Sequence, residues 1–381
     1  MKAWKIAGAV ALAASLGGVA FARTGGPIKI ANVGELSGGG ATVGTNFKNG
    51  ADLAVAEINA KGGILGRTIE ITHADTQSNP GVARAQVQKA LDGNPYVLLG
   101  PGFSGSVKVT ASLAQQAGIA QIMGGEAAEL TQTGNPYLFR TSFGQQSTMP
   151  KVARYIAEDV KAKNVAVIWV NNDFGKGGRD TITKEFAKRG VKVVADISTE
   201  AGQADFAADV AKAKAANPDA LFVYLNEEES ARILKELRRQ NVQVPLIGET
   251  TLTGQKVIEL AGDAANGAIA HVGLTADAPQ PAIKAFDEKF QKEYKYKSDH
   301  NGMKGYSAAY VVKAITEKNK KFDGKEFAKA LHGAKISVKD YPGVLLDVTF
   351  DSNGDLDRES FLVKVVNGKQ VVTSTLPPAG K

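Results

Sequence analysis

The feature of this sequence that most limits its fold is a repeated alternation of short apolar runs with amphipathic segments. Apolar runs of this length, bounded by glycine, proline or asparagine, are typical of buried strands, and helical patterns separate most of them. Two successive blocks show this rhythm, with predicted strands at 28–33, 68–73, 96–99, 119–123 and 137–143, then at 165–170, 191–197, 220–225, 244–248 and 268–273. Such alternation predicts right-handed parallel sheets covered by helices on both faces. The two blocks therefore predict an α/β protein with two doubly wound lobes.

The pattern changes after residue 273. Three helical segments are predicted at 279–294, 304–320 and 324–331. They are followed by predicted antiparallel strands at 344–350, 361–366 and 370–373, with Asn367-Gly368 as a hairpin turn.

The first 22 residues have the pattern of a secretory signal peptide. Lys2 and Lys5 precede an apolar, alanine-rich run at 6–19, and Ala20-Phe21-Ala22 is a small-residue cleavage motif. We expect cleavage after Ala22 and export of a soluble protein to the periplasm. The chain has no cysteine, which excludes disulfides, a thiol nucleophile and lipid attachment after the apolar run. Its stability must therefore come from its apolar core.

The segment 95–107 joins a predicted strand to a predicted helix through the turn Gly100-Pro101-Gly102. Ser104 or Ser106 is expected to cap this helix, leaving backbone N–H groups directed into a crevice. Such a turn binds a carboxylate or a phosphate. A tight turn without a ligand is the alternative.

The same segment partly matches two enzyme motifs. Gly100, Gly102 and Gly105 have the spacing of a dinucleotide fingerprint, but they follow the third predicted strand rather than the first. Ser106 replaces the last glycine of the hydrolase elbow G-x-S-x-G. No histidine stands in a recognisable motif with a serine, so nucleophilic catalysis lacks a paired base.

Other chemistry has little support in the sequence. The four histidines, His73, His271, His300 and His332, share no metal-ligand spacing. Residues 351–357 suggest a calcium loop, but the glycine position and the missing twelfth glutamate favour a polar turn. The net charge of +7 is spread over amphipathic helices, so we expect no nucleic-acid partner.

Polar loops follow several predicted strands in both blocks. They lie at 101–106, 124–126, 171–175, 226–229 and 249–253. The triplet 227–229 is three glutamates at a helix start, where the helix dipole accounts for at least two of the three acidic side chains. Because ligands of open α/β sheets bind outside the carboxyl ends of strands, these loops predict a small polar ligand gripped between two domains.

At this point the residues resemble a known family, the periplasmic substrate-binding proteins of branched-chain amino acid ABC transporters, the leucine/isoleucine/valine-binding type. The resemblance covers nearly all of the chain after the signal peptide. The segments that carry it are 33–38, 56–60, 62–67, Asp75 with 79–80, 100–106, 129–131, 139–141, 173–175 and 305–310.

The resemblance implies a type I fold of two lobes joined by three crossovers, which closes on a ligand and delivers it to a membrane permease. The lobes would comprise 27–142 plus 273–344, and 143–272 plus 345–376. It implies a monomer without enzyme activity, cofactor or metal. The ligand-binding residues it implies are Phe103, Ser104, Gly105, Gly124, Gly125, Glu126, Phe174, Asn226, Glu249 and Thr250.

Two positions depart from the family pattern. Phe174 stands where a tyrosine is common, and Glu126 stands where a threonine or serine is usual. A carboxylate at position 126 would pair with an ammonium group of the ligand or favour a ligand other than an aliphatic amino acid; an exposed loop carboxylate is the alternative. We therefore expect an amino acid receptor. The alternatives are a receptor for an amide, urea or small carboxylate, an exported hydrolase that uses Ser104, or a sensory module of the same fold.

Overall fold

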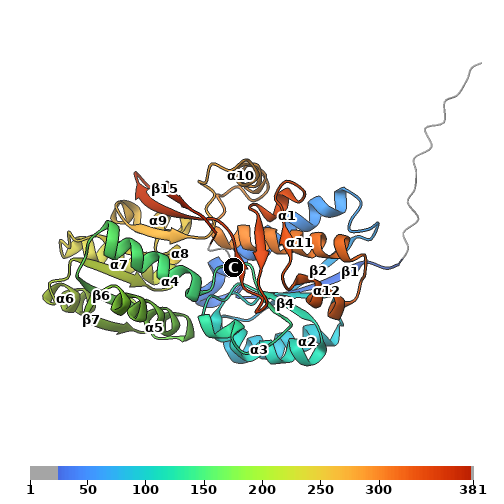
Figure 1. Cartoon of the computed structure of the whole chain (residues 1–381), viewed down its shortest axis with the longest axis horizontal. Coiled ribbons are helices and arrows are strands. Elements are labelled where there is room, and N and C mark those ends of the chain that lie inside the picture. Colours follow the sequence, from blue (N-terminus) through green and yellow to red (C-terminus); the bar gives the residue numbers. More distant parts are fainter. Residues whose placement is uncertain (1–24, 379–381) are drawn as a thin grey trace, which may run out of the picture.

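The computed structural model describes residues 25–378 and contains two lobes, each built on its own sheet (Figure 1). The predicted signal peptide and its cleavage after Ala22 lie outside the described residues. Within those residues, no helix combines the length and the apolar character needed to cross a membrane.

The first sheet is entirely parallel, in the order β2-β1-β3-β4-β5. Its strands are β1 (Ile28–Gly34), β2 (Ile69–Asp75), β3 (Val97–Leu99), β4 (Ala120–Met123) and β5 (Leu138–Arg140). Its helices are α1 (Ala41–Ala60), α2 (Pro80–Asp92), α3 (Ser104–Ala117), α10 (Pro281–Tyr294), α11 (His300–Asn319) and α12 (Gly324–Leu331). Because side chains alternate along a strand, Ile28 and Ile30 share a core with α1 and α11, whereas Ala31 and Val33 share one with α2 and α3.

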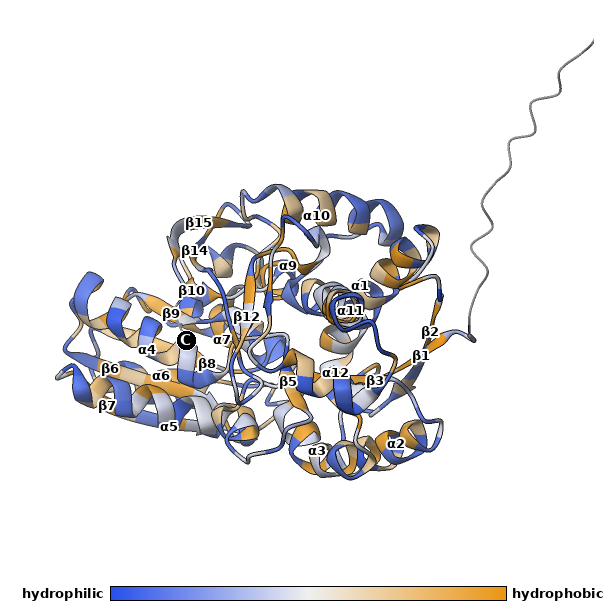
Figure 2. Ribbon diagram, turned by 45° about the vertical axis from the view of Figure 1, so that its right-hand side comes forward, coloured by the Kyte–Doolittle hydropathy of each residue, from blue (hydrophilic) through white to orange (hydrophobic). Residues whose placement is uncertain are grey.

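The second sheet has the order β15-β14-β10-β9-β8-β6-β7. Its strands are β6 (Asn164–Val170), β7 (Lys192–Thr199), β8 (Ala220–Tyr224), β9 (Leu246–Glu249), β10 (Ile269–Val272), β14 (Ser360–Val366) and β15 (Lys369–Leu376). Its helices are α4 (Gln145–Arg154), α5 (Asp173–Lys188), α6 (Ala207–Ala215), α7 (Glu227–Arg239), α8 (Thr250–Thr253) and α9 (Gln255–Ala261). Val165 and Val167 pack with α4 and α5, and Ala166 and Ile168 with α6 and α7. Figure 2 shows the resulting arrangement, with largely apolar strands between helices that carry polar faces.

The C-terminal strands are divided between two sheets. β14 and β15 form the predicted hairpin, with Asn367 and Gly368 both at positive φ in the turn. β12 (Val348–Phe350) instead pairs with β11 (Lys335–Ile336) and β13 (Leu356–Asp357) in a separate antiparallel sheet. The division of the lobes at residue 345 stays a prediction, and this pairing leads us to propose the third crossing between Asp357 and Ser360.

Residues 351–355 form the polar turn that the sequence favours over a calcium loop. The Asp351 carboxylate accepts hydrogen bonds from the N–H groups of Asn353 and Asp355, and Gly354 takes a positive φ of 81°. Across the described residues, no group of three or more acidic, histidine or cysteine side chains is arranged to hold a metal ion.

Candidate functional site

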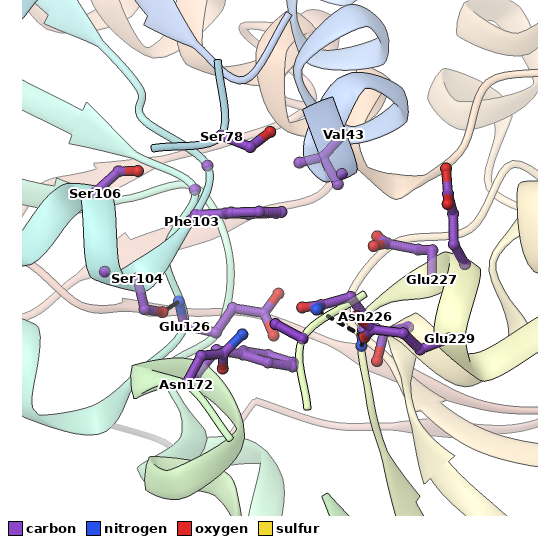
Figure 3. Close-up of a pocket in the computed structure, with 18 of the residues that line it drawn as sticks. Val43, Ser78, Phe103, Ser104, Ser106, Glu126, Asn172, Asn226, Glu227 and Glu229 are labelled. Atoms are coloured by element: carbon purple, nitrogen blue, oxygen red, sulfur yellow. Dashed lines mark hydrogen bonds between the residues drawn. The ribbon is translucent and has the colours of Figure 1, made fainter. Parts of the chain in front are cut away.

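A cleft of about 470 Å³ lies where loops at the carboxyl ends of strands from both sheets meet. From the first lobe it is lined by the start of α1, the start of α3, the loop after β4 and the start of α11; from the second, by the starts of α5 and α7 and by α8. In Figure 3, Phe103, Ser104 and Glu126 lie on one side, and Asn226, Glu227 and Glu229 lie opposite. This is the position predicted for a ligand held between two domains.

Ser104 lies at the first position of α3 and does not cap the helix as predicted. The N-cap is Phe103, and no side chain caps this end. The Ser104 Oγ instead accepts hydrogen bonds from the N–H groups of Glu126 (3.2 Å) and Ala127 (3.1 Å). Because both bonds use the oxygen as acceptor, the hydroxyl hydrogen stays free to be donated to a ligand.

The amides of the glycine turn do not all serve a ligand as predicted. The N–H groups of Gly102 (2.9 Å) and Phe103 (3.2 Å) donate to the carboxylate of Glu35, which is fully buried beneath the turn. Burial raises the pKa of Glu35, and these two bonds oppose that rise. An internal carboxylate therefore occupies two of the donors that the sequence assigns to an anion.

The donors that remain are in the first turn of α3. The backbone N–H groups of Ser104, Gly105 and Ser106 have no hydrogen-bond partner in the described structure, as expected for the first turn of a helix. Together with the Ser104 hydroxyl they form a compact set of donors at the positive end of a helix dipole, suited to a carboxylate.

Glu126 faces the cleft, so the alternative of an exposed loop carboxylate is wrong. Its Oε1 lies 2.8 Å from the Nζ of Lys304 on α11, and both side chains are nearly buried, at 12% and 6% exposure. Burial raises the pKa of Glu126, and the charge of Lys304 opposes that rise. The ammonium group that Glu126 binds in this structure is thus supplied by the chain itself.

Arg140, at the end of β5, holds the loop that carries Glu126. Its guanidinium is fully buried and donates to Asp355 (2.5 Å) and to the carbonyl oxygens of Gly125 (2.6 Å) and Ala127 (2.7 Å). Gly125 does not line the cleft; a side chain there would press on Leu130 and Val107.

The second lobe contributes Glu227, which stands in the 226–229 loop predicted to border the ligand but is not among the ligand-binding residues that the resemblance implies. Asn226 directly precedes α7. The backbone N–H of Asn226 (3.0 Å) and its side-chain amide (2.7 Å) both donate to the Glu229 carboxylate. Glu227 is buried in the cleft lining; its carboxylate bonds no described side chain and accepts only from its own backbone N–H. Burial, with the nearby charge of Asp299, raises the pKa of Glu227 to about 7.

Of the remaining residues implied by the resemblance, some line the cleft and others do not. Phe174 lines the cleft and stacks on Tyr224, with ring centroids 4.2 Å apart. Glu249 and Thr250 do not line it; the Glu249 carboxylate accepts from the Thr250 N–H (2.5 Å) and contacts His271 Nδ1 (3.1 Å). The next residue, Thr251, does line the cleft. A binding role for each of these residues stays a prediction.

α11 brings three more side chains that the sequence did not identify. This helix begins at His300 rather than 304, because the Asp299 carboxylate caps it by accepting from the N–H groups of Asn301 and Gly302. Its first turn thereby places His300 and Asn301, together with Lys304, in the cleft lining. Burial and the charge of Lys304 hold the pKa of His300 well below its usual value, so its ring is neutral.

Known proteins share both the sequence and the fold. The family profile described as periplasmic binding protein matches residues 27–370. The Leu/Ile/Val/Thr-binding protein of Salmonella typhimurium is 30% identical over 93% of this chain and 94% of its own length.

Solved structures share the fold. A leucine-binding protein from Thermotoga maritima has a TM-score of 0.84 at 22% identity, covering 92% of this chain and 99% of its own. A solute-binding protein from R. palustris, in complex with benzoate, has a TM-score of 0.85 at 22% identity, covering 93% and 98%.

The two parallel-rich sheets and the cleft between them define a type I periplasmic binding fold. The chain belongs to the periplasmic binding protein family. Membership of a family of binding proteins confirms the prediction of a receptor without enzyme activity.

Proposed function

We propose that this protein is the periplasmic receptor of an ABC transporter for an α-amino acid. Similar proteins are described as branched-chain amino acid-binding proteins and as ABC transporter solute-binding proteins. The observation that carries the amino acid assignment is that free donors at the start of α3 face, across the cleft, a Glu227 carboxylate that has no salt-bridge partner among the described residues.

The first half of this pairing suits a carboxylate. A ligand carboxylate at the start of α3 would accept from the Ser104 hydroxyl and from the amides of the first turn. Hydrogen bonds to charged groups contribute about 1.5–3 kcal/mol each, roughly twice as much as neutral ones. Two acidic side chains that line the cleft near this end of α3 already have cationic partners: Asp173, beside Gly105, pairs with Lys108, and Glu126 pairs with Lys304.

The second half suits an ammonium group. Glu227 is buried and forms no salt bridge with the described residues; its carboxylate accepts only from its own backbone N–H. Burial raises its pKa and the nearby charge of Lys304 lowers it, but Lys304 is bonded to Glu126, so a ligand ammonium could still supply the missing ion pair. Domain closure would remove the remaining water from the cleft and strengthen this interaction. The chain would close about the three passages between its lobes and then dock on a permease as a monomer.

A small carboxylate without an amino group is the second candidate. Lys304 places a cation in the cleft wall, and related solute-binding proteins from R. palustris were solved with benzoate and 4-hydroxybenzoate. The hydrolase alternative has no such support, because no hydrogen bond joins Ser104 to a histidine among residues 25–378.

The test is a calorimetric comparison of L-amino acids with the matched acids that lack the amino group. We expect binding of at least one amino acid, and a loss of affinity of at least about tenfold for its matched acid. Benzoate binding as tight as that of every amino acid would overturn the proposal in favour of the second candidate.

A further inference from the structure

The cleft contains a polar wall that the α-carboxylate and α-ammonium groups of a ligand would not use. Glu126 and Lys304 form its centre, and His300 and Thr251 line the same cleft. All four residues belong to the cleft lining, and the two charged side chains retain only 12% and 6% exposure. A wall of this kind differs from the apolar surface that an aliphatic side chain needs.

Several atoms of this wall have unused hydrogen-bonding capacity. Glu126 bonds Lys304 through Oε1, and its Oε2 has no partner among the described residues. Lys304 has three ammonium hydrogens, of which this bond uses one. The Oγ1 of Thr251 and the Nδ1 of His300 are buried without a partner in the described part of the chain. The wall therefore presents donors and acceptors together.

We propose that the cleft selects α-amino acids whose side chain ends in a neutral group with both a donor and an acceptor, of which a carboxamide is the simplest. Its carbonyl oxygen would accept from Lys304, and its NH₂ group would donate to the free oxygen of Glu126. This inference rests on the proposed function, because it needs the α-ammonium at Glu227 and the α-carboxylate at α3.

The two charges of the wall favour a ligand side chain that is itself uncharged. Lys304 and Glu126 already balance each other, so a side-chain carboxylate would meet Glu126 and a side-chain ammonium would meet Lys304. An aliphatic side chain would displace water from both charged groups and could not replace the hydrogen bonds that this water makes. A site that hydrogen-bonds a polar ligand discriminates strongly against analogues that leave its polar groups unpaired.

The test compares four unbranched amino acids of similar length that differ at the distal end. Glutamine, glutamate, methionine and lysine are titrated calorimetrically into the full chain. We expect glutamine to bind at least about tenfold more tightly than each of the other three. Equal or tighter binding of methionine, glutamate or lysine overturns the inference.

A double variant tests whether the preference for glutamine depends on the polar wall. Glu126→Leu combined with Lys304→Met removes both charges together, so neither is left buried and unpaired. We expect the glutamine-to-methionine affinity ratio to fall to about one or below in this variant. The matched control is Lys313→Met on the same helix, where Lys313 pairs with Glu317 away from the cleft, and it should keep the ratio of the original chain. An unchanged ratio in the double variant overturns the inference.

A further probe separates this inference from the proposed function. Glutaramate, which is glutamine without its α-amino group, should bind much more weakly than glutamine. If glutaramate binds as well as glutamine, the assignment of Glu227 and the proposed function fail. If glutaramate is weak but methionine equals glutamine, the proposed function stands and only the polar wall is wrong.

Discussion

Replacing Ser104 with alanine should weaken ligand binding more than it weakens the fold. The hydroxyl is expected to donate to the ligand carboxylate, a charge-assisted bond of about 1.5–3 kcal/mol. Its removal should therefore raise the dissociation constant by roughly 10- to 150-fold, at about 1.4 kcal/mol per factor of ten.

The effect of Ser104→Ala on the stability of the fold follows from the two backbone hydrogen bonds that the Ser104 hydroxyl accepts. The N–H groups of Glu126 and Ala127 lose their acceptor in Ser104→Ala. Two neutral hydrogen bonds contribute about 0.5–1.5 kcal/mol each, and water in the cleft would replace part of this. We expect the free energy of unfolding to fall by about 1–2 kcal/mol.

Calorimetry with a bound amino acid and with its carboxamide derivative measures the binding effect. Only the carboxylate ligand should lose affinity strongly in Ser104→Ala, because the derivative carries no negative charge. Ser112→Ala, an exposed serine on the same helix, is the matched control and should change neither quantity. The reasoning would be refuted if Ser104→Ala bound the carboxylate ligand as tightly as the original chain.

Four further outcomes are expected. Arg140→Met should lower the free energy of unfolding by about 3–5 kcal/mol, since it leaves Asp355 buried without its cation, and adding Asp355→Leu should recover part of the loss in chemical denaturation. Because the pKa of Glu227 is raised, the folded protein binds its proton more tightly than the unfolded chain does. Protonated Glu227 therefore stabilises the fold below the usual pKa of 4.5, and this stabilisation is lost as the pH rises to about 7. Affinity for an amino acid should rise over that upper range as Glu227 ionises, and calorimetry at several pH values should show this slope disappear in Glu227→Gln. Small-angle scattering should show a smaller radius of gyration with saturating ligand, whereas superimposable curves would count against closure.

Much of the fold could be predicted from local sequence. Strands β1, β6 and β8 and the Asn367-Gly368 turn are determined by residues that are close together in the sequence. Hydrophobic periodicity and turn chemistry therefore identify them. The pattern of apolar residues predicts the start of α11 four residues late because its first turn, at His300 and Asn301, is polar. The capping carboxylate of Asp299 was the available signal for the earlier start.

The candidate site was harder to predict because its contacts join distant segments. Glu126 and Lys304 are 178 positions apart, and no local pattern shows that they pair. Glu35 reaches the amide of Gly102 from 67 positions away, so the local sequence of the glycine turn does not show that an internal carboxylate occupies its amides. Glu227 is recognisable in the sequence as an acidic residue at a helix start, but its burial in the cleft lining depends on packing that no local pattern shows.

The most direct test of the account measures how strongly Glu227 is coupled to the ligand's ammonium group. The affinities of the preferred amino acid and of its 2-hydroxy analogue are measured in the original chain and in Glu227→Gln, above pH 7 so that the carboxylate is charged. We expect the amino acid to be favoured at least about tenfold in the original chain and this preference largely to disappear in the variant. An equal preference in both chains would contradict the assignment of Glu227 as the partner of the ammonium group.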